Sequence, residues 1–209
     1  MSLIAKKSGG DYTPAPAGTH LAICYGVIDL GTQEENFEGK QKKAEKVRIV
    51  WELPNETTTD GKPMSIGTFY TVSLHEKAKL RKHLEAWRGR PFTEEELKGF
   101  KLTNIIGKPC MLVVVHKPRA NGDGVSDSVM SVSFPMKGMA IPPMFNKPLI
   151  FDIENFDKAV YDSLPDFLKK MVALSPEGAA KLGFRPPVSG QGQAAGGTPG
   201  GEADGDIPF

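Results

Sequence analysis

The fold is built around Lys46-Val47-Arg48-Ile49-Val50-Trp51-Glu52-Leu53, where apolar and polar side chains alternate. One face carries Val47, Ile49, Trp51 and Leu53, and the other carries Lys46, Arg48 and Glu52. Successive side chains of a β-strand point to opposite faces of its sheet. The stretch therefore predicts a strand that packs one face on a hydrophobic core.

Two further strands are predicted on either side of this stretch. Residues 20–30 are apolar at alternate positions, namely Leu21, Ile23, Tyr25 and Val27. Residues 64–74 form a third candidate after the turn Asp60-Gly61-Lys62-Pro63. Turn residues of this kind separate consecutive strands.

A helix is predicted after the third strand. Ser73 and Glu76 have the spacing of a capping box, in which each side chain satisfies a backbone N–H of the first turn. The apolar stripe that follows consists of Leu80, Leu84 and Trp87. Gly89 is placed to end the helix.

A short helix and two more strands follow. Thr93 and Glu96 form a second capping box, which predicts a helix that stops at Gly99. Residues 110–115 are continuously apolar, as in a buried strand, and residues 128–134 alternate again. The order strand, strand, strand, helix, strand, strand predicts a mainly β protein, an OB-fold. This is a five-stranded Greek-key barrel with a helix between strands three and four.

The chain divides into four regions. Residues 1–18 are predicted to be a flexible arm, and residues 19–148 the OB-fold. Residues 149–185 carry short helical patterns, one of which has Phe167, Leu168, Met171 and Val172 as its apolar side, and are expected to pack on the barrel. Residues 186–209 are a Gly- and Pro-rich linker with an acidic tail.

Composition is that of a soluble globular protein, with 39% hydrophobic and 24% charged residues among 209. No apolar run approaches the roughly 20 residues that cross a bilayer, and the N-terminal residues lack the apolar stretch of a signal peptide. Cys24 and Cys110 lie in apolar strand-like segments, which predicts buried free thiols. We therefore expect a reducing, cytoplasmic setting.

Charge is divided unequally along the chain. Residues 186–209 contain three acids and no Lys or Arg, so the remaining 22 acids and all 26 basic residues lie in residues 1–185. The body therefore carries a charge of +4 and the tail −3. A basic body with an acidic tail is typical of a nucleic-acid binder.

The C-terminal residues are Asp204-Gly205-Asp206-Ile207-Pro208-Phe209. This ending resembles the tail of bacterial single-stranded DNA-binding proteins, usually Asp-Asp-Asp-Ile-Pro-Phe, and matches five of its six positions. The ring of Phe209 can fill an apolar pocket while its carboxylate and the acids meet a basic rim. A tail that served solubility alone would not need an apolar end. The predicted partner-docking residues are Asp204, Asp206, Ile207, Pro208 and Phe209.

Basic residues cluster where the first two predicted strands connect. In an OB-fold this loop and strand flank the binding groove, so lysines there would contact phosphates while aromatic rings stack on bases. A merely solvated charged loop is the alternative. Phe69 and Tyr70 are adjacent on the third predicted strand and must point to opposite faces, so at least one is expected outside the core, and Lys117 and Arg119 enter the loop between strands four and five. The predicted DNA-binding residues are Phe37, Lys40, Lys42, Lys43, Lys46, Arg48, Phe69, Tyr70, Lys117 and Arg119.

Catalytic motifs are not found in the sequence. The four histidines show no metal-ligand spacing with each other or with the cysteines. Gly61-Lys62-Pro63 lacks the rest of a phosphate-binding loop. We expect no enzyme activity, no metal and no cofactor.

Five segments of the body carry a second family resemblance: Pro16-Ala17-Gly18-Thr19-His20, Lys46 to Leu53, Phe151-Asp152-Ile153-Glu154-Asn155-Phe156-Asp157, Leu164 to Lys170, and Ser175-Pro176-Glu177. They resemble single-stranded DNA-binding proteins encoded by bacteriophages. The resemblance implies an OB-fold coating protein for phage DNA replication or recombination, acting in the cytoplasm of the bacterial host. It also implies that the tail engages helicases, primases, nucleases or recombination proteins of phage or host.

Two functions remain open at this point. The first is sequence-tolerant binding and protection of single-stranded DNA, with recruitment of DNA-processing proteins through the tail. The second is a protein-interaction adaptor that occupies host DNA-processing factors through the tail without coating DNA.

Overall fold

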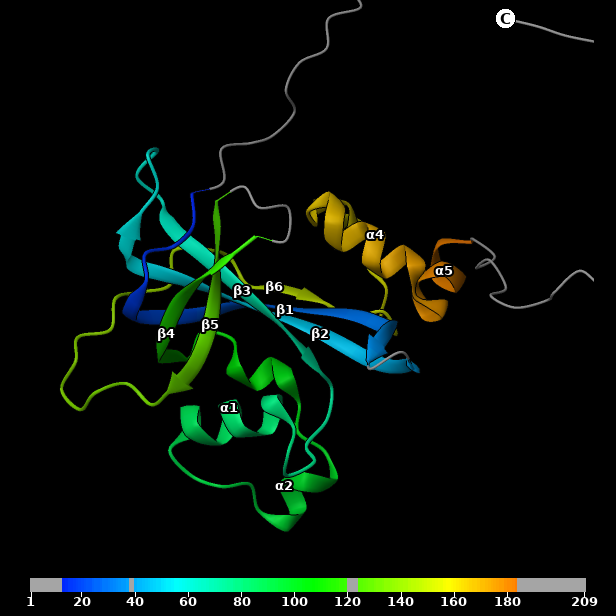
Figure 1. Ribbon diagram of the computed structural model, residues 1–209, viewed down its shortest axis with the longest axis horizontal. Coiled ribbons are helices and arrows are strands. Elements are labelled where there is room, and N and C mark those ends of the chain that lie inside the picture. Colours follow the sequence, from blue (N-terminus) through cyan, green and yellow to red (C-terminus); the bar gives the residue numbers. More distant parts are fainter. Residues whose placement is uncertain (1–12, 38–39, 120–123, 184–209) are drawn as a thin grey trace, which may run out of the picture.

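A computed structural model describes residues 13–183, apart from 38–39 and 120–123. Its main element is one sheet of six strands (Figure 1). The strands are β1 Gly18–Phe37, β2 Lys40–Thr57, β3 Pro63–Thr71, β4 Pro109–Pro118, β5 Val125–Ser133 and β6 Leu149–Phe151. The prediction of a mainly β protein is confirmed.

β1 is the central strand of the sheet. It pairs antiparallel with β2 on one side and β4 on the other, and the path of neighbours runs β3-β2-β1-β4-β5. β2 with β3, and β4 with β5, are also antiparallel. β6 was not predicted as a strand. It pairs in parallel with β1, where Val27 lies opposite Ile150.

One hydrophobic core lies between the sheet and helix α1 (Lys79–Arg88). The predicted apolar stripe of Leu80, Leu84 and Trp87 is buried there, and the rings of Trp87 and Trp51 are 5.9 Å apart. The alternation that predicted β2 is confirmed, because Val47, Ile49, Trp51 and Leu53 all belong to this core. Both cysteines are also buried and free, as predicted.

The predicted start of α1 is wrong. Ser73 and Glu76 form no capping box: the Ser73 hydroxyl accepts from the His75 amide, and α1 begins at Lys79 without a side-chain cap. The Arg81 guanidinium donates to the Leu74 carbonyl and holds the preceding turn outside the helix. The predicted end is confirmed, since Gly89 adopts a left-handed conformation with φ of 67°.

The second capping box is confirmed. Thr93 accepts from the Glu96 amide, and the Glu96 carboxylate accepts from the Thr93 amide. These bonds open α2 (Glu94–Lys98), which ends at Gly99. A 3-10 helix, η1 (Leu102–Ile105), then leads into β4.

β1 differs from the prediction of a strand with one buried face. Ala22 and Cys24 pack in the core beneath α1, whereas Ile28 and Leu30 pack in a second core on the other face. Two bulges in its pairing with β2, at Cys24/Gly26 and Asp29/Gly31, shift which side chains face each core. A strand covered on both faces has no simple alternation.

The second core joins the sheet to three C-terminal helices. They are α3 Lys158–Ser163, α4 Asp166–Leu174 and α5 Pro176–Leu182. Leu164, Leu168 and Val172 are buried against Ile28, Leu30 and Val50 of the sheet. Figure 1 shows α4 and α5 on one side of the sheet and α1 and α2 on the other.

Polar contacts fix these helices to β1. Ser175 caps α5 by accepting from the Gly178 amide. The Glu177 carboxylate accepts from the backbone amide and the hydroxyl of Thr32, at 2.9 and 2.6 Å. Gly31 has φ of +64°, and a Cβ there would lie 2.6 Å from the Ser175 hydroxyl oxygen. Only glycine fits this approach without displacing α5.

The assignment of residues 19–148 and 149–185 to separate regions stays a prediction. The predicted arm is described only from residue 13, and the predicted linker and tail lie outside the described residues. Of the helices in the described part of the chain, none is long and apolar enough to span a membrane.

Candidate nucleic-acid interface

The basic cluster lies on a paired strand and not, as predicted, mainly in a loop. β1 and β2 continue to pair as far as Phe37 opposite Lys40. Lys43 lies opposite Glu34, and their charged groups are 3.2 Å apart. Lys42 lies opposite Glu35. Opposite charges on facing strands favour pairing, so the ion pair of Lys43 with Glu34 supports this two-stranded arm.

Strand geometry sorts the cations of β2 between two faces. Lys42, Lys46 and Arg48 occupy alternate positions, so they lie on the same face. Lys43 lies on the opposite face, in line with the core residues Val47 and Ile49. We call the surface formed by Lys42, Lys46, Arg48 and Phe69, together with Phe167 of α4, the β2–β3 strip.

Arg48 is the centre of the strip. Its guanidinium carbon lies 4.6 Å from the ring centroid of Phe69, which is opposite it on β3, and 5.3 Å from that of Phe167. The two rings are 41% and 48% exposed, high for side chains of this size. A Cβ on Gly67 would lie 2.7 Å from guanidinium nitrogens of Arg48, so the glycine makes room for the side chain to lie flat. The result is an exposed aromatic and cationic surface.

Lys46 lies next to Arg48 on the strip. Its ammonium donates to the Thr71 hydroxyl at 2.7 Å, which positions the charge at the end of β3. Lys42, four residues further out on the arm, is exposed. The three cations of the strip therefore follow the direction of β2 for several residues.

The strip ends where later segments cover β2. Val50 is buried in the core under α4. The Glu52 carboxylate is fully buried and accepts from the amides of Phe145 and Asn146 and from the Asn146 side chain, at 2.7 to 2.8 Å. Three donors compensate the cost of burying this charge. The outer face of β2 is thus covered at Val50 and Glu52, and the strip lies on its part from Lys42 to Arg48.

Tyr70 does not belong to the strip. Phe69 and Tyr70 were predicted to point to opposite faces, and they do: Phe69 is exposed and Tyr70 is buried. The Tyr70 hydroxyl is 2.8 Å from Nδ1 of His83, and the Lys79 ammonium lies 5.5 Å from the Tyr70 ring centroid. Burial, with the charge of Lys79 as a second cause, lowers the pKa of His83 to about 4.

Lys117 and Arg119 are also apart from the strip, at the far end of β4. Arg119 donates from Nε to the Val125 carbonyl, and its amide donates to Gly124, so it ties together the β4–β5 hairpin. Lys117 is exposed. It is near enough to Lys79 to lower the pKa of that group, after burial as the main cause.

The remaining predicted site residues lie outside the described structure. Phe37 and Lys40 close the ladder of the arm through their backbones, but their side chains lie outside the described ones. Asp204, Asp206, Ile207, Pro208 and Phe209 are also outside. The structure thus brings together Lys42, Lys46, Arg48 and Phe69 of the predicted set.

Phe167 is the strip residue that the sequence analysis missed. Its helical spacing placed it with Leu168 and Val172 on the apolar side of α4, and only those two are buried. In the sequence, the one indication that Phe167 is exposed is its position at the border of the apolar face of α4, next to the buried Leu168.

In residues 13–183, as far as they are described, no three His, Cys, Asp or Glu side chains are arranged to hold a metal ion. Comparison of the chain with protein-family models and with curated proteins finds no match.

Proposed function

We propose that this protein binds single-stranded DNA on the β2–β3 strip without sequence preference and recruits DNA-processing proteins through residues 204–209. The Arg48 guanidinium between the exposed rings of Phe69 and Phe167 is the observation that carries the proposal. Every base has a face that can stack on an aromatic ring, so this kind of contact tolerates any sequence.

In the proposed binding mode, aromatic residues contact the bases and cationic residues contact the phosphates. Phe69 and Phe167 would stack on bases, each contributing roughly 1–3 kcal/mol. Lys42, Lys46 and Arg48 would contact phosphates and release counterions, which makes affinity depend on salt. Their spacing along one face of β2 matches a strand of DNA that follows the arm.

The proposal includes the OB-fold and the phage setting that the resemblance implies. The order β1-β2-β3-α1-β4-β5 and the neighbour path β3-β2-β1-β4-β5 support an OB-fold. In that fold the binding surface includes the face of strands two and three, where the strip lies. The protein would then coat DNA during phage replication or recombination in the host cell.

The test is an equilibrium titration of the full chain with oligo(dT) and with duplex DNA of the same length. We expect tighter binding to oligo(dT), with affinity that falls steeply as salt rises. Equal affinity for both forms, or no salt dependence, would contradict the proposal.

Lys42 and Lys43 provide a matched pair for the same titration. Lys42→Ala should weaken binding and reduce the slope of log affinity against log salt by roughly 0.7. Lys43→Ala removes the same charge from the opposite face and should have a smaller effect. Equal losses in both variants would indicate that general charge, and not the strip, binds DNA.

The adaptor without DNA binding is the second candidate, and the apolar Ile207-Pro208-Phe209 ending favours it equally. It predicts that the full chain fails to bind oligo(dT) at any salt concentration. The titration therefore separates the two functions.

A further inference from the structure

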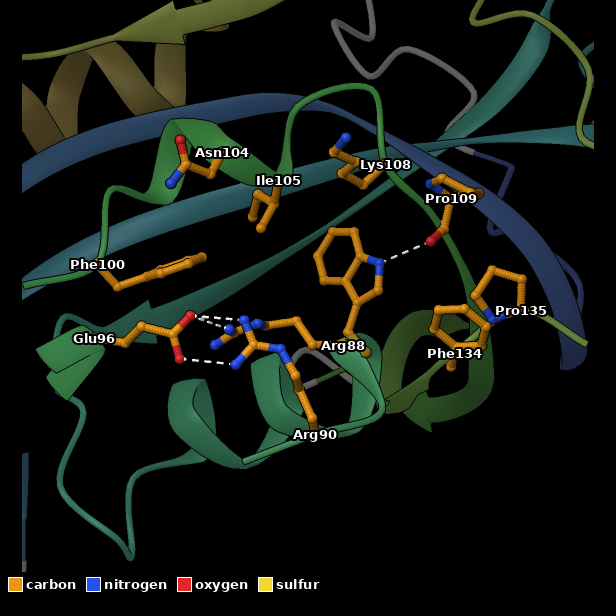
Figure 2. Close-up of a pocket in the computed structure, with 11 residues that line it drawn as sticks. Arg88, Arg90, Glu96, Phe100, Asn104, Ile105, Lys108, Pro109, Phe134 and Pro135 are labelled. Atoms are coloured by element: carbon orange, nitrogen blue, oxygen red, sulfur yellow. Dashed lines mark hydrogen bonds and ion pairs between the residues drawn. The ribbon is translucent and has the colours of Figure 1, made fainter. Parts of the chain in front are cut away.

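A second surface, away from the strip, has the chemistry to bind an acidic peptide with an apolar end. It is a pocket of about 510 Å³ between α1, α2, η1 and the start of β4, and Figure 2 shows its lining. Its volume is within the range of pockets that bind ligands. This pocket takes no part in the proposed DNA binding, because none of its lining residues belongs to the strip.

The walls of the pocket are mainly apolar. Phe100 and Ile105 form one side and Phe134 and Pro135 the other, as Figure 2 shows. Phe134 is 62% exposed at the rim, although its ring packs beside Gly89 at the end of α1. Trp87 also lines the pocket, and its indole N–H donates to the Pro109 carbonyl at 2.8 Å. The apolar surface is thus rigidly held and still accessible.

Positive charge is in excess around these walls. Arg88, Arg90 and Lys108 line the pocket with a single carboxylate, Glu96. Arg90 donates to both Glu96 oxygens, at 2.8 and 3.0 Å, and Arg88 donates to one of them. The Arg90 bond first, and then the Thr93 amide, lower the pKa of Glu96 to about 2, so the carboxylate stays ionised. With three cations and one carboxylate, the pocket lining carries a net charge of +2.

One donor in the pocket lacks a partner. Among the described residues, Nη1 of Arg88 is buried and makes no hydrogen bond. The Arg88 guanidinium lies against the rings of Phe92 and Phe100, at 4.4 and 5.3 Å from their centroids. A buried donor without an acceptor is costly, so the Arg88 guanidinium would gain a hydrogen bond by turning Nη1 toward a carboxylate bound in the pocket.

This chain itself contains a segment with the complementary chemistry. Residues 202–209 carry Glu202, Asp204 and Asp206 followed by Ile207-Pro208-Phe209, and no basic residue lies in 186–209. The acids match the cationic rim, and an aromatic ring beside a rigid proline matches the apolar walls.

Chain length permits the contact within one molecule. The 18 residues from 184 to 201 are rich in Gly, Pro and Ala. As a random coil they would span on the order of 23 Å. A domain of this size has a radius of gyration of about 16 Å. Because α5 and the pocket lie on opposite sides of the sheet, the segment must cross on the order of 40 Å, the diameter of such a domain. Eighteen residues extend to about 60 Å, so the segment reaches the pocket when the linker is stretched beyond its average span.

We propose that residues 202–209 dock in the pocket of the same molecule, with Ile207 and Phe209 against the apolar walls and the acids on Arg88, Arg90 and Lys108. Docking conceals the partner-recruiting residues while the strip remains open to DNA. The tail is thereby stored on a surface separate from the DNA-binding one.

The test is site-specific photo-crosslinking in the full chain. Phe209 is replaced by p-benzoylphenylalanine, the protein is irradiated at low concentration, and crosslinked peptides are identified by mass spectrometry. The proposal expects crosslinks within one molecule to the segments around Phe100–Lys108 or Phe134–Pro135. Crosslinks to β2 or β3, crosslinks only between two molecules, or no crosslinks would each overturn it.

Variants of the pocket give an independent check. Lys108→Glu reverses an exposed charge, and Phe134→Ala removes an exposed ring, so neither disturbs the core. Together they should reduce the crosslink yield by roughly tenfold. Lys82→Glu, on the exposed face of α1 outside the pocket, is the matched control and should leave the yield unchanged. Equal losses in the variant and the control would overturn the proposal.

Failure of this proposal can be distinguished from failure of DNA binding. Lys108→Glu with Phe134→Ala should bind oligo(dT) as the unaltered protein does, because the strip is intact. The crosslink needs no DNA, so its result does not depend on the proposed function.

Discussion

At the scale of single residues, Arg48 connects packing to the proposed chemistry. Its guanidinium is flat against Phe69, close to Phe167 and above Gly67, so the two rings are held in place although both are exposed. Ordering exposed side chains in advance reduces the entropy lost on binding. The rings of Phe69 and Phe167 are therefore already ordered for stacking in the protein without DNA.

The stacking residues give the first prediction. Phe69→Ala should weaken oligo(dT) binding by roughly 1–3 kcal/mol, because a base would lose its aromatic contact. Leu174→Ala, which truncates a side chain that is 72% exposed on α4 outside the strip, is the control. Fluorescence anisotropy with labelled oligo(dT) measures both variants, and equal affinities would exclude Phe69 from the interface.

His83 gives a prediction about pH. Its pKa is about 4 in the folded protein, below the ordinary 6.5, because burial disfavours the charged ring. Between these values the unfolded chain binds a proton that the folded protein does not, so stability falls as pH is lowered from 6.5 to 4. The slope is at most about 1.4 kcal/mol per pH unit, reduced by the partial solvent contact of the ring.

Urea unfolding at pH 7 and pH 4.5 tests this for the unaltered protein and for His83→Gln. The substitution removes the titrating group, so the variant should lose less stability between the two pH values. Identical losses would show that His83 does not contribute to the pH dependence.

Strand alternation alone predicts the surroundings of several residues correctly. Adjacent strand residues must point to opposite faces, and this predicted the division between Phe69 and Tyr70. The same rule explains why Lys42 and Lys43 belong to different surfaces. Phe167 was missed because its exposure depends on how α4 crosses β2, a tertiary property that helical spacing does not contain.

At the scale of elements, the β1–β2 arm shows how charges extend a sheet. The Lys-rich segment has no apolar alternation, so it was interpreted largely as a loop. Its facing partner, Glu34 for Lys43, lies on another strand, and their pairing becomes visible only in the register. Similarly, the bulges of β1 and the turn before α1 are set by contacts with distant residues, which local patterns do not report.

The contact between β1 and α5 gives an element-scale prediction. Gly31→Ala should destabilise the protein, because the new Cβ would meet Ser175 and Glu177 in addition to the strain of a positive φ. Gly61→Ala has the same kind of strain, with φ of +76°, but no atom within 4 Å of the new Cβ. The difference between the two variants therefore isolates the clash with α5, about 1–3 kcal/mol.

Chemical denaturation measures the free energy of unfolding of both glycine variants. Hydrogen exchange locates the destabilised region, and for Gly31→Ala the loss of amide protection should be concentrated in α4 and α5. Equal destabilisation by the two substitutions would mean that α5 does not pack closely on β1.

At the scale of the whole molecule, two cores on opposite faces of one sheet leave different surfaces open. α1 and α2 close one face and form the pocket, whereas the C-terminal helices cover much of the other face and leave the strip. The mainly β class and the order of the first five strands and α1 followed from hydrophobic periodicity. β6 did not, because three residues are too few for a periodic signal, and the covering of β2 by residues 145–146 depends on the buried Glu52 carboxylate.

The tail gives a prediction for the molecule as a whole. Deletion of residues 202–209 should leave oligo(dT) binding unchanged or slightly tighter, because three acids are removed while the strip is untouched. The same deletion should abolish binding to proteins recruited through this segment, measured by pull-down with the full chain as reference. Weaker DNA binding after deletion would show that the tail contributes to the DNA site.

DNA binding on the β2–β3 strip is tested most directly by photo-crosslinking of the full chain to an oligonucleotide that contains 5-iodouracil, with the crosslinked residues mapped by mass spectrometry. We expect crosslinks at Phe69 or Phe167, on the strip that Arg48 organises. Crosslinks confined to other aromatic residues such as Phe134, or none under conditions where the DNA is bound, would contradict it.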